Sequence, residues 1–156
     1  MPKDKMIRVL VVDDSATVRK WISRILTKEY GFEIVDQAIN GEIGVEMARR
    51  LNPDIIVMDV DMPVMDGLRA TETILREIAV PILVFTSTAI YRNRQVPFRA
   101  LSAGALDVML KPRLLDEAAT ERIADTLPDR LIHQMIGRDV VHHHPQHLTR
   151  PLGAVP

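Results

Sequence analysis

The sequence contains no cysteine, no long apolar run and almost no net charge. Without cysteine the chain forms no disulfides and has no thiolate chemistry, which agrees with a reducing cytoplasm. The first apolar run, Ile7–Val12, is too short for a membrane span or a signal-peptide core, and acidic residues follow it directly. A net charge of -1 gives no general attraction to nucleic acid or to an anionic membrane. We therefore expect a cytoplasmic protein that binds neither.

A glycine-rich phosphate-binding loop is also missing after the first apolar run. Residues 13–17 read Asp-Asp-Ser-Ala-Thr there, which argues against a small flavodoxin-like enzyme. The 156 residues, 47% hydrophobic and 26% charged, suit one soluble globular domain with an appendage. We predict a domain over residues 1–127, followed by a short helix and a linker or tail over residues 128–156.

Strand-like and helix-like segments alternate along the chain. Apolar, often β-branched stretches predict buried strands at 7–12, 32–37, 54–58, 81–85 and 105–110. Apolar residues at helical spacing predict helices at 16–30, 41–51, 68–78, 92–103 and 114–126. Five such units predict an α/β fold, a five-stranded parallel sheet with helices on both faces. We expect the flavodoxin-like strand order 2-1-3-4-5, in which ligands bind at the carboxyl ends of the strands where the order reverses.

Acidic residues follow the two strands that flank this reversal. Asp13 and Asp14 come after the first strand, and Asp59 ends the third. Three neighbouring carboxylates repel one another unless a cation neutralises them, and oxygen ligands favour a hard ion such as Mg2+. With Mg2+ bound, a carboxylate can attack a phosphoryl group and hold it as an aspartyl phosphate.

Two further strands end in side chains that suit phosphate. Thr86 offers a hydroxyl and Lys111 an ammonium group. Taken singly, Thr86 reads as a strand-end hydroxyl, Lys111 as a surface cation and Asp59 as the start of a turn. Their occurrence in order, at the ends of successive strands, favours one joint site. A cis Lys111–Pro112 peptide bond, which would aim the lysine inward, is a further hypothesis.

Four groups of residues form a specific pattern: Val11-Val12-Asp13-Asp14-Ser15, Met58-Asp59 with Met62-Pro63 and Asp66-Gly67, Thr86-Ser87, and Lys111-Pro112. Over roughly residues 7–127 the chain resembles a response-regulator receiver domain. The resemblance implies a two-component phosphorelay in which a histidine kinase donates phosphate to Asp59.

The resemblance also implies roles for the neighbours of Asp59. Thr86 and Lys111 would contact the phosphoryl group. The implied Mg2+ ligands are the carboxylates of Asp13, Asp14 and Asp59 and the backbone carbonyl of Asp61. The side chain of Asp61 would lie near the water that hydrolyses the phosphoryl group.

Residues 86–88 and 99–108 resemble the receiver of chemotaxis protein-glutamate methylesterases, which also carry a linker and a catalytic domain with a serine triad. Because the chain ends at Pro156, we expect either a receiver fragment with its linker or a free-standing receiver that binds a partner when phosphorylated. No residue of this chain is expected to be an esterase nucleophile. Receivers often form homodimers through their fourth and fifth helices, and Tyr91, Val96 and Phe98 either supply such contacts or pack inward.

Val108 departs from the receiver pattern, which usually has Phe or Tyr three residues before the lysine. The aromatic ring swings inward on phosphorylation, whereas a β-branched valine cannot. We therefore expect phosphorylation to reorganise residues 86–91 more than the fifth strand.

The tail has two features of its own. Leu131, Ile132, Met135 and Ile136 have the spacing of a short amphipathic helix, which would pack on the receiver or on another chain. All five histidines lie from His133 onward, four of them within residues 142–147. A Zn2+ or Ni2+ site is one interpretation, and an exposed polar linker is the one we favour.

Overall fold

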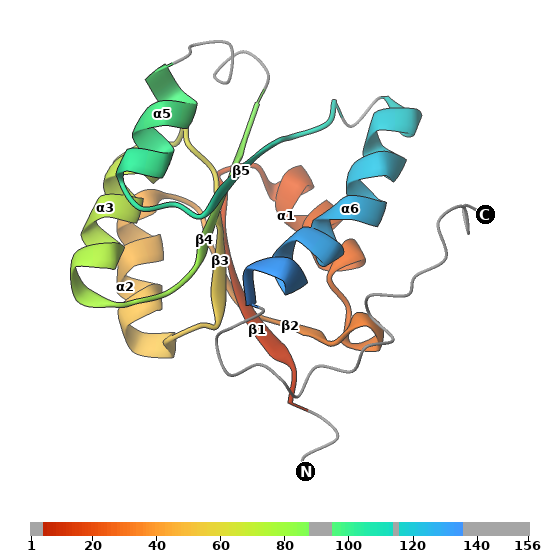
Figure 1. Ribbon diagram of the computed structural model, residues 1–156, viewed down its shortest axis with the longest axis horizontal. Helices are drawn as coiled ribbons and strands as arrows, with labels where there is room; N and C mark the ends of the chain where they lie inside the picture. The colour runs from red at the N-terminus through yellow and green to blue at the C-terminus, as the bar shows by residue number, and fades with distance from the viewer. Residues whose placement is uncertain (1–4, 88–94, 114–115, 136–156) are drawn as a thin grey trace.

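Five parallel strands form a single sheet in the order β2-β1-β3-β4-β5 (Figure 1). The computed structural model describes residues 5–87, 95–113 and 116–135. The strands are β1 (Ile7–Val12), β2 (Phe32–Ala38), β3 (Ile55–Met58), β4 (Ile82–Thr86) and β5 (Asp107–Leu110). This topology confirms the predicted fold, and the strand order reverses between β1 and β3.

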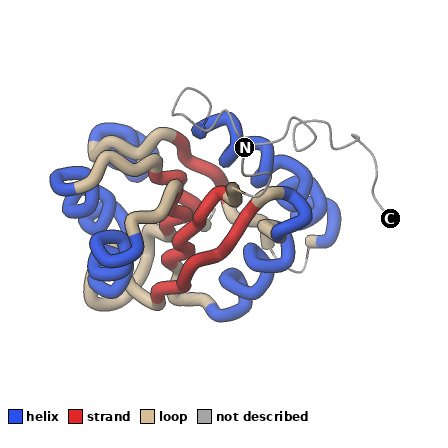
Figure 2. Tube along the Cα trace, turned by 90° about the horizontal axis from the view of Figure 1, so that it is seen from below, coloured by secondary structure: helices blue, strands red, loops and turns tan. Residues whose placement is uncertain are grey.

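Helices cover both faces of the sheet, as Figures 1 and 2 show. α2 (Gly41–Leu51), α3 (Gly67–Glu77) and α5 (Gln95–Ser102) lie on one side. α1 (Ala16–Ile25), the short 3-10 helix η1 (Lys28–Tyr30) and α6 (Glu117–Met135) complete the described helices, and α1 and α6 cover the other face. None of the described helices is long and apolar enough to span a bilayer.

The two helical layers enclose two separate cores. Along β1, Leu10 and Val12 belong to the core beneath α2 and α3, whereas Val9 and Val11 belong to the core beneath α1 and α6. Successive side chains of a strand point to opposite faces, so a strand covered on both sides is apolar at every position. This double burial explains why β1 and β3 appear in the sequence as continuous apolar runs.

α6 is longer than the sequence predicts. A helix ending near residue 126 and a separate short helix after Pro128 were expected. Proline disfavours a helix interior. Instead α6 runs through Pro128 to Met135, and the predicted boundary at residue 127 falls inside it. Leu131, Ile132 and Met135 pack against the sheet, in the same core as Ile7 and Phe32. This burial offsets the local cost of the proline.

An ion pair also fixes the second half of α6. The Arg130 guanidinium binds the Asp107 carboxylate through two contacts, Nε to Oδ2 at 2.6 Å and Nη2 to Oδ1 at 2.5 Å. Asp107 is the first residue of β5, so this pair joins α6 to the edge strand of the sheet. Ile136 and the histidine-rich segment lie outside the described residues.

Candidate functional site

The backbone of the sheet brings the predicted acidic residues together. β1 and β3 are paired with Val12 opposite Met58, so Asp13 and Asp59 leave the sheet side by side. The Asp59 N–H donates to the Val12 carbonyl at 2.8 Å. One carboxylate oxygen from each of Asp13, Asp14 and Asp59 lies within 4.8 Å of the other two. Asp13 and Asp59 are buried, 2% and 5% exposed, whereas Asp14 faces solvent.

Lys111 reaches the same two buried carboxylates. Its Nζ lies 2.6 Å from Asp13 Oδ2 and 2.8 Å from Asp59 Oδ1. Its backbone N–H donates to the Thr86 carbonyl at 2.7 Å, which sets the lysine beside the end of β4. The described chain contains no cis peptide bond, so the cis hypothesis for Lys111–Pro112 is wrong. The lysine side chain is long enough to reach the acids from a trans backbone.

Asp59 has the strongest electrostatic perturbation in the described site. Burial, followed by repulsion from Asp13, raises the pKa of its carboxyl group from 3.8 to about 7. The charge and hydrogen bond of Lys111 and the Val60 N–H at 2.8 Å act in the opposite direction. Desolvation therefore outweighs the lysine. Additional positive charge at these carboxylates would favour the ionised, nucleophilic form of Asp59.

Thr86 ends β4 with a buried hydroxyl group. The residue is 0% exposed, and its Oγ1 has no hydrogen-bond partner among the described residues. An unpaired buried hydroxyl costs free energy that an incoming oxygen acceptor can recover. Thr86 and Lys111 thus provide two donor side chains at neighbouring strand ends.

The loop after β3 holds the backbone of Asp59 against α3. The Gly67 N–H donates to the Val60 carbonyl at 2.8 Å, and a Cβ added at Gly67 would overlap the carbonyl oxygen of Asp59. In the sequence, Asp66-Gly67 has the appearance of ordinary turn residues. The close approach gives Gly67 a specific role, because only glycine leaves room for this backbone.

Val64, in the same loop, adopts a strained conformation. Its φ is 70°, which is rare for a β-branched residue, and the flanking Met65 N–H donates to the Pro63 carbonyl at 2.8 Å. The side chain is 74% exposed. The Met65 carbonyl accepts the Gly41 N–H at 3.0 Å, which ties this loop to the start of α2.

The remaining predicted residues lie around this centre or away from it. Asp61 is exposed two residues beyond Asp59, and its role as a backbone ligand stays a prediction. Val108 is half-buried and packs on the core beneath α2 and α3. On α5, Val96 is buried and Phe98 is 72% exposed. Tyr91 and the four histidines within 142–147 lie outside the described residues.

The donor set fits Mg2+. Three carboxylates supply hard oxygen ligands, and the ion needs only one or two of them alongside waters and a phosphate oxygen.

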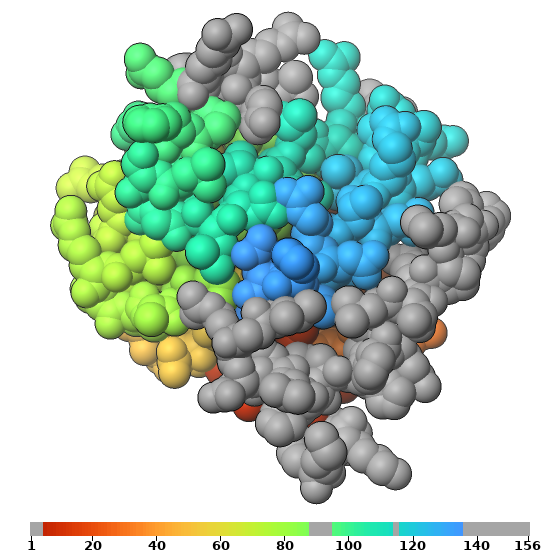
Figure 3. Space-filling model, viewed as in Figure 1, coloured from red at the N-terminus to blue at the C-terminus, as the bar shows by residue number. Residues whose placement is uncertain are grey.

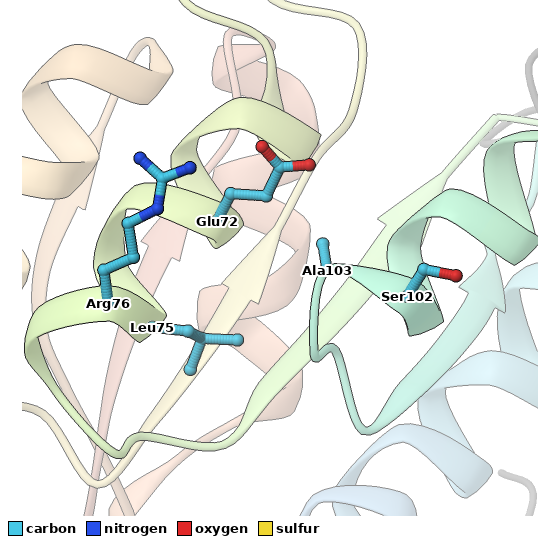
Figure 4. Close-up of a pocket in the computed structure, with 5 residues that line it drawn as sticks. All are labelled: Glu72, Leu75, Arg76, Ser102 and Ala103. Carbon is cyan, nitrogen blue, oxygen red and sulfur yellow. The ribbon is translucent and has the colours of Figure 1, made fainter.

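A separate cleft between α3 and α5, shown in Figure 4, is lined by Glu72, Leu75, Arg76, Ser102 and Ala103. It shares no residue with the acidic cluster.

The sheet order, the acidic cluster and the lysine are those of a receiver fold, and comparison with known sequences agrees. Residues 9–121 match the response regulator receiver domain, and the chain belongs to this family. It is 43% identical over 116 residues to protein-glutamate methylesterase/protein-glutamine glutaminase 1 of Vibrio vulnificus strain YJ016, a match that covers 74% of this chain and 30% of the relative. The chain thus spans about a third of the length of the curated relatives it matches.

Two solved structures are also similar. The response regulator domain of Thermotoga maritima CheB is 31% identical, with a TM-score of 0.75, and the match covers 83% of this chain and 96% of that one. A chain of the CheX–CheY–BeF3–Mg complex from Borrelia burgdorferi is 30% identical, with a TM-score of 0.63, over 78% of this chain and 88% of that one.

Proposed function

We propose that this receiver is a Mg2+-dependent phosphoacceptor in a cytoplasmic two-component phosphorelay, with Asp59 as the residue that takes phosphate from a histidine kinase. The observation that carries the proposal is the set of charges around Asp59. The Asp13 and Asp14 carboxylates lie beside it, where they would bind Mg2+, and the Lys111 ammonium lies 2.8 Å from Asp59 Oδ1. The Mg2+ in the complex of the similar Borrelia structure supports the same assignment.

In the proposed transfer, an Asp59 carboxylate oxygen bonds to phosphorus while the bond between phosphorus and the kinase imidazole nitrogen breaks. The imidazole leaves, and the product is an acyl phosphate on Asp59. Water later attacks the phosphorus, which releases inorganic phosphate and restores the carboxylate. Mg2+, held by Asp13, Asp14, Asp59 and the Asp61 carbonyl, would supply positive charge that neutralises the phosphoryl oxygens.

Lys111 and Thr86 complete the proposed site. Lys111 already spans two carboxylates, so it can shift toward a phosphoryl oxygen without leaving Asp59. Thr86 would donate its unpaired hydroxyl to a second phosphoryl oxygen. Val108 cannot swing as an aromatic ring does, so we infer that the loop after Thr86 carries the signal.

We further propose that the output is of the chemotaxis methylesterase type, because the similar Vibrio protein is named a protein-glutamate methylesterase and is more than three times as long as the matched region. The alternative is a free-standing receiver that binds a partner or a second copy when phosphorylated. Exposed Phe98 and Leu101 on α5 favour such a surface. α5 lies on the face of the molecule shown in Figure 3.

Beryllofluoride, which mimics an aspartyl phosphate, tests the phosphoacceptor assignment. In the presence of MgCl2, amide spectra of the wild type should shift when beryllofluoride is added, whereas Asp59→Asn should not respond to beryllofluoride. Glu33→Gln, the same carboxylate-to-amide change at an exposed position of β2, should keep the response. An unchanged response in Asp59→Asn would refute the assignment. Dimerisation with beryllofluoride that is lost in Phe98→Asp would favour the free-standing alternative.

A further inference from the structure

Arg19 occupies an unfavourable position for a cation. It is the fourth residue of α1, near the positive end of the helix dipole, and the first turn contains no acidic residue. A positive side chain there destabilises a helix slightly. A compensating interaction with a negatively polarised group would offset this cost.

The compensating interaction is with the backbone of a proposed metal ligand. Arg19 Nη1 donates to the carbonyl oxygen of Asp13 at 2.7 Å. With this bond, every polar group of Asp13 has a partner. Its N–H donates to the Ala38 carbonyl, its Oδ1 accepts the Ser15 N–H at 2.9 Å, and its Oδ2 pairs with Lys111.

These contacts differ in whether they can persist when a cation binds. Lys111 occupies Asp13 Oδ2, so it competes directly with a divalent ion for that oxygen. The Arg19 bond is to the main-chain carbonyl and occupies neither carboxylate oxygen. The backbone of Arg19 lies in the first turns of α1, where its carbonyl accepts the Ser23 hydroxyl at 2.9 Å. Of the two cationic side chains that contact Asp13, Lys111 competes with a metal ion and Arg19 does not.

We propose that Arg19 is a positioning residue for the cation site: it holds the turn between β1 and α1 so that the Asp13 carboxylate stays in place once Lys111 releases it. The inference rests on the proposed Mg2+ site. Residues that orient metal ligands from behind commonly change metal affinity by tenfold or more when they are removed.

The test compares two charge-removing variants on the same helix. Arg19→Met keeps the aliphatic stem and loses the guanidinium, and Lys20→Met removes the same charge from an exposed neighbour. EDTA-treated protein is titrated with MgCl2, and the dissociation constant is read from the amide shifts of residues 13–18. We expect binding about tenfold weaker in Arg19→Met. Lys20→Met should bind equally or slightly more tightly, because a repelling charge is gone.

The two variants lose the same charge, so a loss of Mg2+ affinity in Arg19→Met alone separates a positioning role from simple electrostatics. Tighter or unchanged Mg2+ binding in Arg19→Met would overturn the proposal. Arg19→Lys retains a donor and the charge, and it should recover part of the lost affinity. If Arg19→Met does not fold, Arg19→Lys provides the test. A Mg2+ affinity of Arg19→Lys equal to that of the wild type would then count against the proposal. Failure of the wild type to bind Mg2+ would instead refute the proposed function.

Discussion

Replacement of Asp59 by asparagine should change how the stability of the fold depends on pH. The pKa of Asp59 is raised from 3.8 to about 7 by burial and by Asp13. The native state therefore holds a proton that the unfolded state has lost between these two values, and stability falls as pH rises through this window. Above about pH 7 the full decrease in stability is present, and below about pH 4 this decrease is absent.

The size of this effect follows from the shift. Each pKa unit corresponds to about 1.4 kcal/mol, so a shift of roughly three units costs the wild type about 4 kcal/mol at pH 8. Asparagine carries no charge at any pH, has nearly the same shape and can still pair with Lys111. The stability of Asp59→Asn relative to the wild type should therefore rise by about 4 kcal/mol between pH 4 and pH 8.

Urea unfolding in EDTA, followed by circular dichroism at several pH values, measures this difference. Parallel curves for the wild type and Asp59→Asn would show that burial and repulsion do not raise this pKa. A variant that loses stability relative to the wild type as pH rises would contradict the sign of the shift.

Four other substitutions test the packing. Thr71→Val should raise the free energy of unfolding by about 1 kcal/mol in urea titrations, because the Thr71 hydroxyl is buried without a partner among the described residues. Val64→Gly should gain about 1 kcal/mol by relieving the positive φ, and an unchanged or lower thermal midpoint would contradict this. Gly67→Ala should cost about 3 kcal/mol or more through overlap with the Asp59 carbonyl, seen as a lower urea midpoint. Arg130→Ala should cost about 1 kcal/mol in the same assay, less at high salt, because its pair with Asp107 is partly exposed.

The strands and their order were accessible from sequence because burial on both faces leaves a simple signal. β1 and β3 are apolar at nearly every position, and the acids that follow them occur where a parallel sheet gathers its strand ends. The grouping of Asp13, Asp14 and Asp59 follows from that geometry alone. Local pattern and tertiary structure agree in this part of the molecule, so short motifs were sufficient.

Other features depend on contacts that no local pattern encodes. The expected helix ended at residue 126, but α6 continues through Pro128, and the burial of Leu131 and Met135 against the sheet stabilises this continuation. Gly67 resembles any turn glycine until the Asp59 carbonyl is seen against it. In the sequence Arg19 is only a cation near a helix N-terminus, which is a weak indication of a role. Its bond to the Asp13 carbonyl is seen only in the structure.

Phosphorylation by a small-molecule donor tests the central claim most directly. The protein is incubated with acetyl phosphate and MgCl2, and its intact mass and the modified residue are determined by mass spectrometry. We predict the gain of one phosphoryl group, located at Asp59, absent without Mg2+ and absent from Asp59→Asn. A phosphoryl group on another residue of the wild type, or equal labelling of Asp59→Asn, would contradict the assignment of Asp59 as the phosphoacceptor.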